Sequence, residues 1–153
     1  MALFLSSFEK QIDKKGRVSV PPAFRAVLQN QNFNGVIMYP SFVHGCIEAC
    51  GMDRIEALHA QMESLDPFSE ERDAFATAIL GGSVQLPLDG EGRVVIPENL
   101  LADAKIAGKA VFVGKGATFE IWEPGAHAAH AAAARDLAKR QRLQLKSSPR
   151  REG

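Results

Sequence analysis

The chain has 153 residues, of which 46% are hydrophobic and 24% are charged, and its formal net charge is zero. This composition is typical of a globular protein with room for one ordinary domain, or for two small units that share a core. No run of about 18 apolar residues is present, which excludes a membrane-spanning helix, and two cysteines are too few for a disulfide framework. The start, MALFLSSFEKQ, lacks a basic leader and a long apolar run, so we expect no export signal and a cytoplasmic protein.

The zero net charge hides an uneven distribution. Residues 9–25 carry a charge of +3 and residues 135–153 a charge of +5, so the rest of the chain carries −8. A polyanion responds to the local field rather than to the total charge, so two basic ends are compatible with nucleic-acid binding. Charge runs are more often plain solvated surface, and that alternative stays open from the distribution alone.

The first chemically distinctive stretch is DKKGRVSVP, residues 13–21. Asp13 can accept hydrogen bonds from the backbone ahead of it, and Gly16 tolerates a positive φ, which together are typical of a tight turn. Residues 17–20 then alternate, which predicts a short strand with its valines on one face and Arg and Ser on the other. Pro21 ends that strand and favours the start of a helix.

A short helix and two strands are expected next. PAFRAVLQ, residues 22–29, has helical apolar spacing, and GVIMY and GCIEA are short apolar strands. Two further helical stretches follow, MDRIEALHAQMESL and SEERDAFATAIL, and the second ends at a pair of glycines, residues 81–82. The second stretch begins with acidic residues, as the helix dipole favours.

The phrase then returns as DGEGRVVIP, residues 89–97, at an offset of 76 residues. It is again followed by a helix, PENLLADAKI, and by two strands, AVFVG and TFEIW. Each unit of strand, turn, strand, helix, strand, strand is too small to bury its own sheet, so two units should pack on a shared interior. We place the first repeat at residues 1–68 and the second at residues 69–145, including an alanine-rich C-terminal helix, and expect a disordered basic tail at residues 146–153.

Two copies of Asp-x-x-Gly-Arg-Val-x-[Val/Ile]-Pro, followed by FR in the first and LL in the second, resemble the MraZ proteins of bacteria. These are tandem-repeat relatives of the AbrB-type swapped-hairpin DNA-binding domains. The resemblance covers about residues 1–145, and EIW near the end of the second repeat adds to it. It implies a mainly β fold with helices (α+β), in which both repeats form a double-split β-barrel extended by connecting helices and a C-terminal helix.

The resemblance also implies a function. Such proteins are ring-shaped homo-oligomers in the cytoplasm or on the nucleoid, and they regulate transcription of the division and cell-wall gene cluster that includes their own gene. They bind short G-rich direct repeats in that promoter. The first Arg of the phrase contacts DNA in the family, so Arg17 inherits that role here, with Lys15 beside it.

The two copies differ in charge, and this predicts which one contacts DNA. Residues 13–17 carry +2, whereas residues 89–93 carry −1, because Gly90 and Glu91 stand where the first copy has Lys14 and Lys15. Affinity for DNA comes largely from neutralised phosphates, which favours the first copy, and Ser19 is a further phosphate donor that the second copy replaces with Val95. The predicted DNA-binding residues are therefore Lys10, Lys14, Lys15, Arg17, Ser19 and Arg25, with Arg93 secondary.

Several alternatives remain at this stage. Arg17 could simply pair with Asp13 as part of the turn. An AbrB-like antitoxin is the runner-up function, although the second complete repeat argues against it. The lysines could instead serve a ring that binds only proteins. Cys46, Cys50 and His44 lack a second pair of metal ligands, and His127 and His130 are expected to be exposed on the last helix. We therefore predict no metal, cofactor, membrane partner, small-molecule substrate or catalytic residue, and hence no enzyme.

Overall fold

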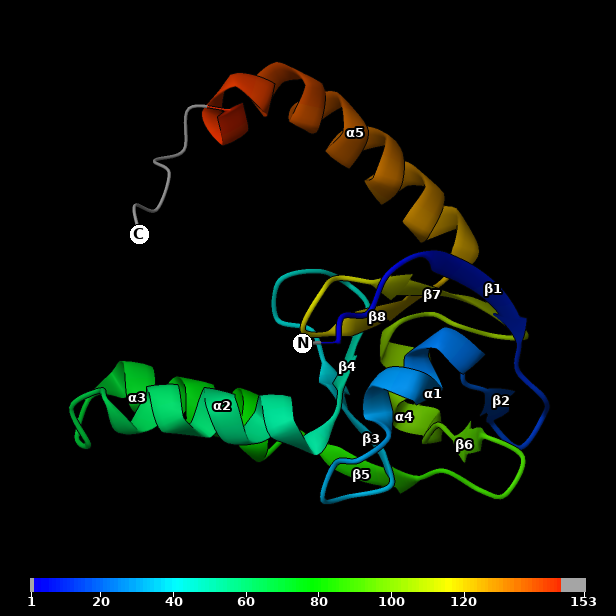
Figure 1. Ribbon diagram of the computed structural model, residues 1–153, viewed down its shortest axis with the longest axis horizontal. Coiled ribbons are helices and arrows are strands. Elements are labelled where there is room, and N and C mark those ends of the chain that lie inside the picture. The colour runs from blue at the N-terminus through cyan, green and yellow to red at the C-terminus, as the bar shows by residue number, and fades with distance from the viewer. Residues whose placement is uncertain (1, 147–153) are drawn as a thin grey trace.

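The computed structural model describes residues 2–146, and Figure 1 shows how their helices and strands are arranged. None of the described helices combines the length and apolar character needed to cross a bilayer. Lys146 is the last residue of the C-terminal helix, and the rest of the predicted disordered tail lies outside the described residues.

Both repeats have the predicted order of elements. The first contains β1 (Ser7–Gln11), β2 (Arg17–Ser19), α1 (Pro22–Leu28), β3 (Gly35–Pro40) and β4 (Ile47–Cys50). The second contains β5 (Val84–Pro87), β6 (Arg93–Val95), α4 (Glu98–Asp103), β7 (Lys109–Gly114) and β8 (Phe119–Trp122). The local patterns of the two nine-residue phrases therefore predicted the strand, turn and helix of each unit correctly.

The two repeats exchange their first strands. A six-stranded antiparallel sheet has the order β1-β7-β8-β4-β3-β5, so β1 pairs with the second repeat and β5 with the first. The last strands of the two repeats, β4 and β8, pair at the centre. A separate two-stranded ribbon joins β2 to β6. The fold is mixed α+β with a large antiparallel sheet; its closure into a double-split barrel stays a prediction, because β1 and β5 each pair on one side only within the described residues.

One core serves both repeats. Val18, Phe24, Phe112, Phe119 and their equivalents in both repeats belong to a single buried cluster. Phe24 of α1 packs against Phe119 of β8 with ring centroids 4.8 Å apart, which ties a helix of the first repeat to a strand of the second. Aromatic pairs at this separation add to the free energy gained from burying their surface. The shared interior fixes the positions of the short ribbon and its flanking loops.

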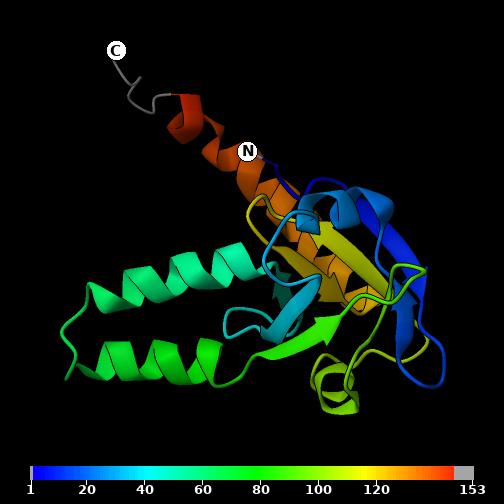
Figure 2. The same ribbon diagram turned by 60° about the horizontal axis from the view of Figure 1, so that its bottom comes forward.

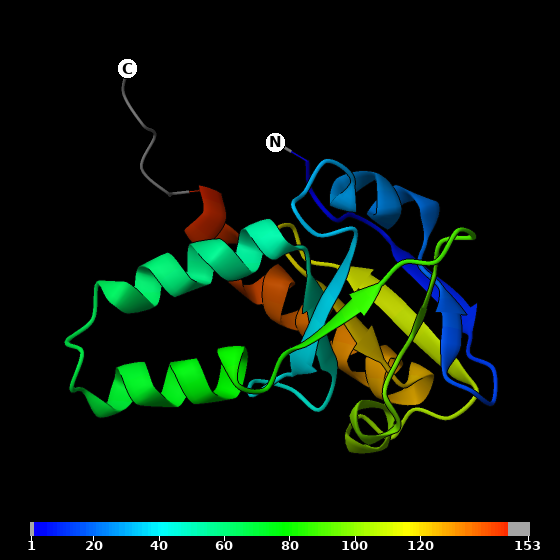
Figure 3. The ribbon, with the colours of Figure 1, turned by 90° about the horizontal axis from the view of Figure 1, so that it is seen from below.

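A helical hairpin separates the repeats and projects from the sheet (Figures 2 and 3). It consists of α2 (Met52–Glu63) and α3 (Glu70–Phe75), and the latter continues as a π-helical turn, η1 (Ala76–Leu80). The Ser69 side chain caps α3 by accepting a 3.1 Å hydrogen bond from the Arg72 backbone N–H. Tyr39, Met62 and Ile79 form a small second core that holds the hairpin to β3.

The C-terminal helix α5 (Pro124–Lys146) extends away from the sheet (Figure 1). Its start is capped by the Glu123 carboxylate, which accepts a 2.8 Å hydrogen bond from the Ala126 backbone N–H. This contact lowers the pKa of Glu123. The expectation that His127 and His130 are exposed was wrong, because both are half-buried against Trp122. Helical spacing alone does not reveal which side chains in the first two turns face the body.

Candidate nucleic-acid interface

The β2–β6 ribbon presents one face to the core and one to solvent. Val18 and Val94 lie opposite each other and are buried. Because side chains alternate along a strand, the neighbouring positions point outward. Arg17 lies across from Val95, and Ser19 across from Arg93. The outer face of the ribbon therefore carries Arg17, Ser19, Arg93 and Val95 together.

The first loop, residues 13–17, is organised by the Asp13 carboxylate. Its Oδ1 accepts hydrogen bonds from the backbone N–H groups of Lys15 and Arg17, both at 2.9 Å. Its Oδ2 accepts from Arg17 Nε at 2.8 Å. The Arg17 side-chain bond, followed by these backbone bonds, holds the pKa of Asp13 below its usual range. Arg17 and Asp13 thus form the ion pair that the sequence left open as an alternative, while the Arg17 side chain stays 42% exposed.

The second loop, residues 89–93, repeats this geometry. Asp89 accepts from the backbone of Glu91 and Arg93 and from Arg93 Nε, each at 2.9 Å. The second loop also contains a second carboxylate near its arginine: Glu91 Oε2 lies 3.5 Å from Arg93 Nη1. The Asp89 hydrogen bond and these negative charges raise the pKa of Arg93. Arg93 therefore forms ion pairs with two carboxylates, those of Asp89 and Glu91. Arg17 forms its ion pair with the Asp13 carboxylate.

Each loop is hydrogen-bonded to the backbone of the other repeat. The Ile96 N–H donates to the Gly16 carbonyl at 2.9 Å, and the Val20 N–H donates to the Gly92 carbonyl at 3.0 Å. Gly16 has φ +86° and Gly92 has φ +76°, conformations that favour glycine. These crossed bonds fix the ribbon and both turns as one rigid, two-sided element.

Two predicted residues lie away from the outer face of the ribbon. Arg25 of α1 donates from Nη1 to the Glu91 carbonyl at 3.2 Å, so it supports the acidic second loop. Lys10 lies on β1 opposite Ala110 of β7 and is half-buried. Of the predicted residues, the structure thus brings Arg17, Ser19 and Arg93 together. It places Lys14 and Lys15 at the adjoining turn. Lys10 and Arg25 lie apart from both groups.

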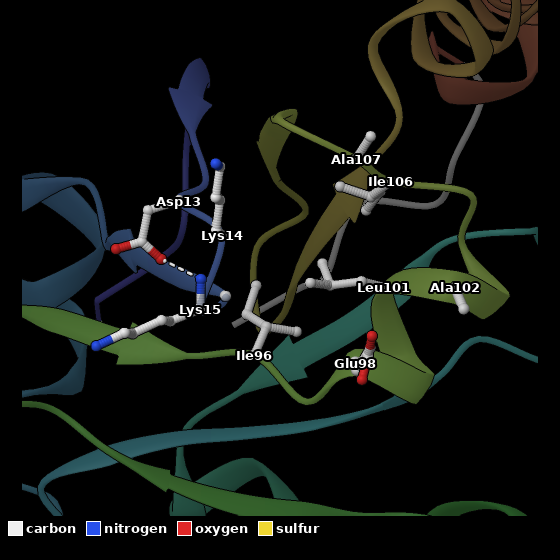
Figure 4. A pocket seen from close by; sticks show the side chains of 10 residues that line it. Asp13, Lys14, Lys15, Ile96, Glu98, Leu101, Ala102, Ile106 and Ala107 are labelled. Carbon is white, nitrogen blue, oxygen red and sulfur yellow. Dashed lines mark hydrogen bonds between the residues drawn. The ribbon is translucent and has the colours of Figure 1, made fainter.

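An open groove of about 690 Å³ lies beside the first loop. Lys14 and Lys15 form one side, and α4 with the segment after it forms the other (Figure 4). The apolar wall includes Leu101 and Ile106, and Glu98 lies on the α4 side. The sequence did not predict this groove, because its walls come from different repeats and no local pattern links them.

The comparisons identify the relatives of this chain. The family model described as "MraZ protein, putative antitoxin-like" matches residues 79–146. A protein of Rickettsia bellii (strain OSU 85-389), named "Transcriptional regulator MraZ", is 54% identical over 149 residues, 97% of this chain and 99% of the relative. Proteins of the same name from Rickettsia akari and Rickettsia felis are each 51% identical over 148 residues, again 97% of this chain and 99% of the relative. With this identity over nearly the full length of both chains, the protein belongs to the MraZ family.

Proposed function

We propose that this chain is a transcriptional regulator that binds duplex DNA through the outer face of the β2–β6 ribbon and the first loop. The main support is that Arg17 and Arg93 share the outer face of the ribbon. The loop next to Arg17 has a charge of +2. The chain's relatives are named transcriptional regulators, which supports the same role. We place its action in the cytoplasm on the nucleoid, and we assign it no catalytic activity.

The β2–β6 ribbon is of a kind that can read bases. A two-stranded antiparallel ribbon fits the major groove of B-form DNA, where arginine can donate two hydrogen bonds to guanine O6 and N7. Asp13 binds Arg17 through Nε, so the two terminal nitrogens can still present a planar fork to a base edge. Asp13 thereby positions Arg17 as well as pairing with it. Ser19, Lys14 and Lys15 would donate to phosphate oxygens on either side.

The wider proposal follows the family resemblance. The target would be short G-rich direct repeats upstream of the division and cell-wall gene cluster that includes the chain's own gene. The chain would bind them as a ring-shaped homo-oligomer with its strands closed into a double-split barrel. Several ribbons at fixed spacing would turn weak single contacts into high avidity, so tandem boxes should bind far more tightly than one box.

The test is binding of a fluorescent duplex from the gene's upstream region, measured by anisotropy over a salt series. Arg17→Ala should weaken specific binding by about 1–3 kcal/mol, because it removes a base contact. Arg93→Ala, the matched position on the same face, should lose less, because Glu91 and Asp89 already neutralise it. Lys14→Ala should weaken binding evenly across sequences and lower the salt slope by about one.

Two results would remove the proposal. Unchanged affinity of the Arg17→Ala chain would refute the role of that residue. A wild-type chain that binds no duplex even at low salt would favour the remaining alternatives, an AbrB-like antitoxin or a ring that binds only proteins.

A further inference from the structure

Three histidines and the chain's only tryptophan meet where α5 joins the sheet. Trp122 ends β8, and His127 and His130 lie in the first two turns of α5. His44 comes from the loop between β3 and β4, in the other repeat. We call these four residues the His–Trp cluster. None of the four belongs to the proposed DNA-binding surface.

The rings of the cluster are in direct contact. His130 stacks on Trp122 with ring centroids 4.7 Å apart and an interplanar angle of 19°. The His44 ring lies 4.4 Å from that of His130 and 5.6 Å from that of Trp122. His127 meets Trp122 edge-on at 6.2 Å. The rings of His44, His130 and Trp122 therefore form a triangle in which each touches the other two.

Charged groups from β4, β8 and the turn between β7 and β8 lie near the cluster. Glu120 of β8 is buried and accepts a 2.9 Å hydrogen bond from Trp122 Nε1. Lys115 Nζ lies 3.9 Å from Glu120 Oε1, and Glu48 of β4 is the cross-strand partner of Glu120. Burial lowers the pKa of His130; His44, Lys115 and His127 lower it further, and Glu120 opposes them.

Adding one proton to the His44–His130 pair should affect the docking of α5 differently from adding two. A single imidazolium on the Trp122 face gains a cation–π attraction, and the Glu120 carboxylate also favours it. A second imidazolium on the His44–His130 pair would place two like charges in adjoining rings at 4.4 Å. The pair can therefore hold one proton while docked, but the second opposes docking.

The cluster lies where α5 is attached to the body. Beyond Ala131, every described side chain of this helix is exposed, so its attachment to the body depends on the first two turns. The free part of the helix carries four cations with described side chains: Arg135, Lys139, Arg140 and Arg142. Moving the first turns would carry these charges to a new position.

We propose that the His–Trp cluster is a proton-operated latch, in which the second proton on the His44–His130 pair releases α5 from Trp122. At neutral pH the helix is docked and its cations have a fixed direction. In mild acid the helix swings free of the sheet without unfolding the shared core. This device is independent of the ribbon and would operate even if Arg17 had no part in DNA binding.

Trp122 makes the latch directly observable, since it is the only tryptophan and is 5% exposed when docked. Acrylamide quenching of its fluorescence should be weak at pH 7.5 and rise several-fold only at a pH below about 6.5, the usual pKa of histidine, because the pKa of His130 is lowered and the second proton is opposed by the first. Far-UV circular dichroism should stay unchanged over the same range, because the helix leaves the sheet but keeps its own hydrogen bonds.

His44→Gln is the decisive variant, because it removes the repulsion and keeps the stack of His130 on Trp122. Its quenching should stay low throughout the range. His59→Gln is the matched control, since His59 lies exposed on α2 beside Glu63, and it should behave as the wild type. His130→Gln should show raised quenching that no longer depends on pH.

Either of two results overturns the latch. One is wild-type quenching that is constant from pH 7.5 to the onset of acid unfolding. The other is a rise of equal size and midpoint in the His44→Gln chain.

Discussion

Asp13 and Asp89 fold two turns in the same way, although the two loops differ in charge. Each carboxylate binds the same two backbone N–H positions and the same arginine nitrogen. The turns therefore need the aspartate in both repeats, whatever each loop contacts. The difference lies in the two residues that follow the aspartate, Lys14 and Lys15 in one loop and Gly90 and Glu91 in the other.

The substitution Asp13→Asn should keep the shape of the first turn and remove the negative charge of its aspartate. The amide oxygen can still accept from the backbone, but Arg17 loses its ion pair and the loop rises from +2 to +3. Duplex affinity at low salt should increase for any sequence, and discrimination between a G-rich box and a scrambled one should narrow, because Arg17 is less well positioned.

Competitive anisotropy titrations with both duplexes measure this effect, and Asp89→Asn is the control at the equivalent position. A narrower discrimination in the Asp89→Asn chain than in the Asp13→Asn chain would contradict the assignment.

Gly16→Ala tests the crossed contact between the repeats. The left-handed backbone alone costs a non-glycine residue about 1–2 kcal/mol. An added Cβ would also lie 2.6 Å from the Ile96 carbonyl oxygen, so the free energy of unfolding should fall by more than that cost. Urea denaturation gives the value, and Gly116→Ala is the control, because Gly116 has the same left-handed backbone, with φ +88°, but is surrounded by open space. Equal losses in the two variants would show that the contact is unimportant.

At the scale of elements, the repeat predicted each unit but not how the units combine. The alternation of residues 17–20 and the proline after them indicated a strand followed by a helix, and β2 with α1 confirms it. The pairing of β1 with β7 could not be predicted this way, because periodicity shows which face of a strand is buried and not which strand lies beside it.

The candidate site was predictable where it depends on local chemistry. Turn residues and alternation placed Arg17 and Ser19 on an outer face, and β2 has them there. Arg25 could not be placed, because its hydrogen bond reaches Glu91, 66 residues away in the chain. The His–Trp cluster likewise depends on a loop and a helix from different repeats, and single-residue patterns carry no sign of it.

The central β4–β8 pair contains an unfavourable contact that a conservative change should relieve. Glu48 and Glu120 face each other across the two strands, and burial, followed by the Glu120 charge, raises the pKa of Glu48. Glu48→Gln should therefore increase the free energy of unfolding at pH 7 by about 0.2–1 kcal/mol, the usual size of a cross-strand pair effect.

The sign of the pH dependence follows from the raised pKa. Glu48 has a higher pKa in the folded wild type than its usual value near 4.5 in the unfolded chain. Its contribution to the free energy of unfolding is therefore fully present below pH 4.5 and is lost as the pH rises through the raised pKa. The advantage of Glu48→Gln should accordingly disappear as the pH falls toward 4.5. Denaturant midpoints over a pH series test this, with Glu9→Gln on exposed β1 as control. An advantage independent of pH would contradict it.

For the whole molecule, exchanged strands and a shared core mean that the repeats should fold as one cooperative unit. Fragments 1–68 and 69–146 each lack a strand partner and half of the core, so neither should give a cooperative transition alone in dilute solution. Mixing them in equal amounts should restore the circular dichroism and Trp122 fluorescence of the intact chain. A dilute single fragment that unfolds cooperatively would show that the repeats are independent domains.

The central claim is that charge makes the first loop the DNA-binding one, and exchanging the loop charges tests it most directly. Lys14→Gly with Lys15→Glu changes the first loop from +2 to −1, the charge of the second, and Gly90→Lys with Glu91→Lys gives the second loop +2. We predict that the first double variant loses most of its affinity for the upstream duplex, with a salt slope lower by about two, and that the second binds more tightly than the wild type. Wild-type affinity in the Lys14→Gly, Lys15→Glu chain would contradict the account.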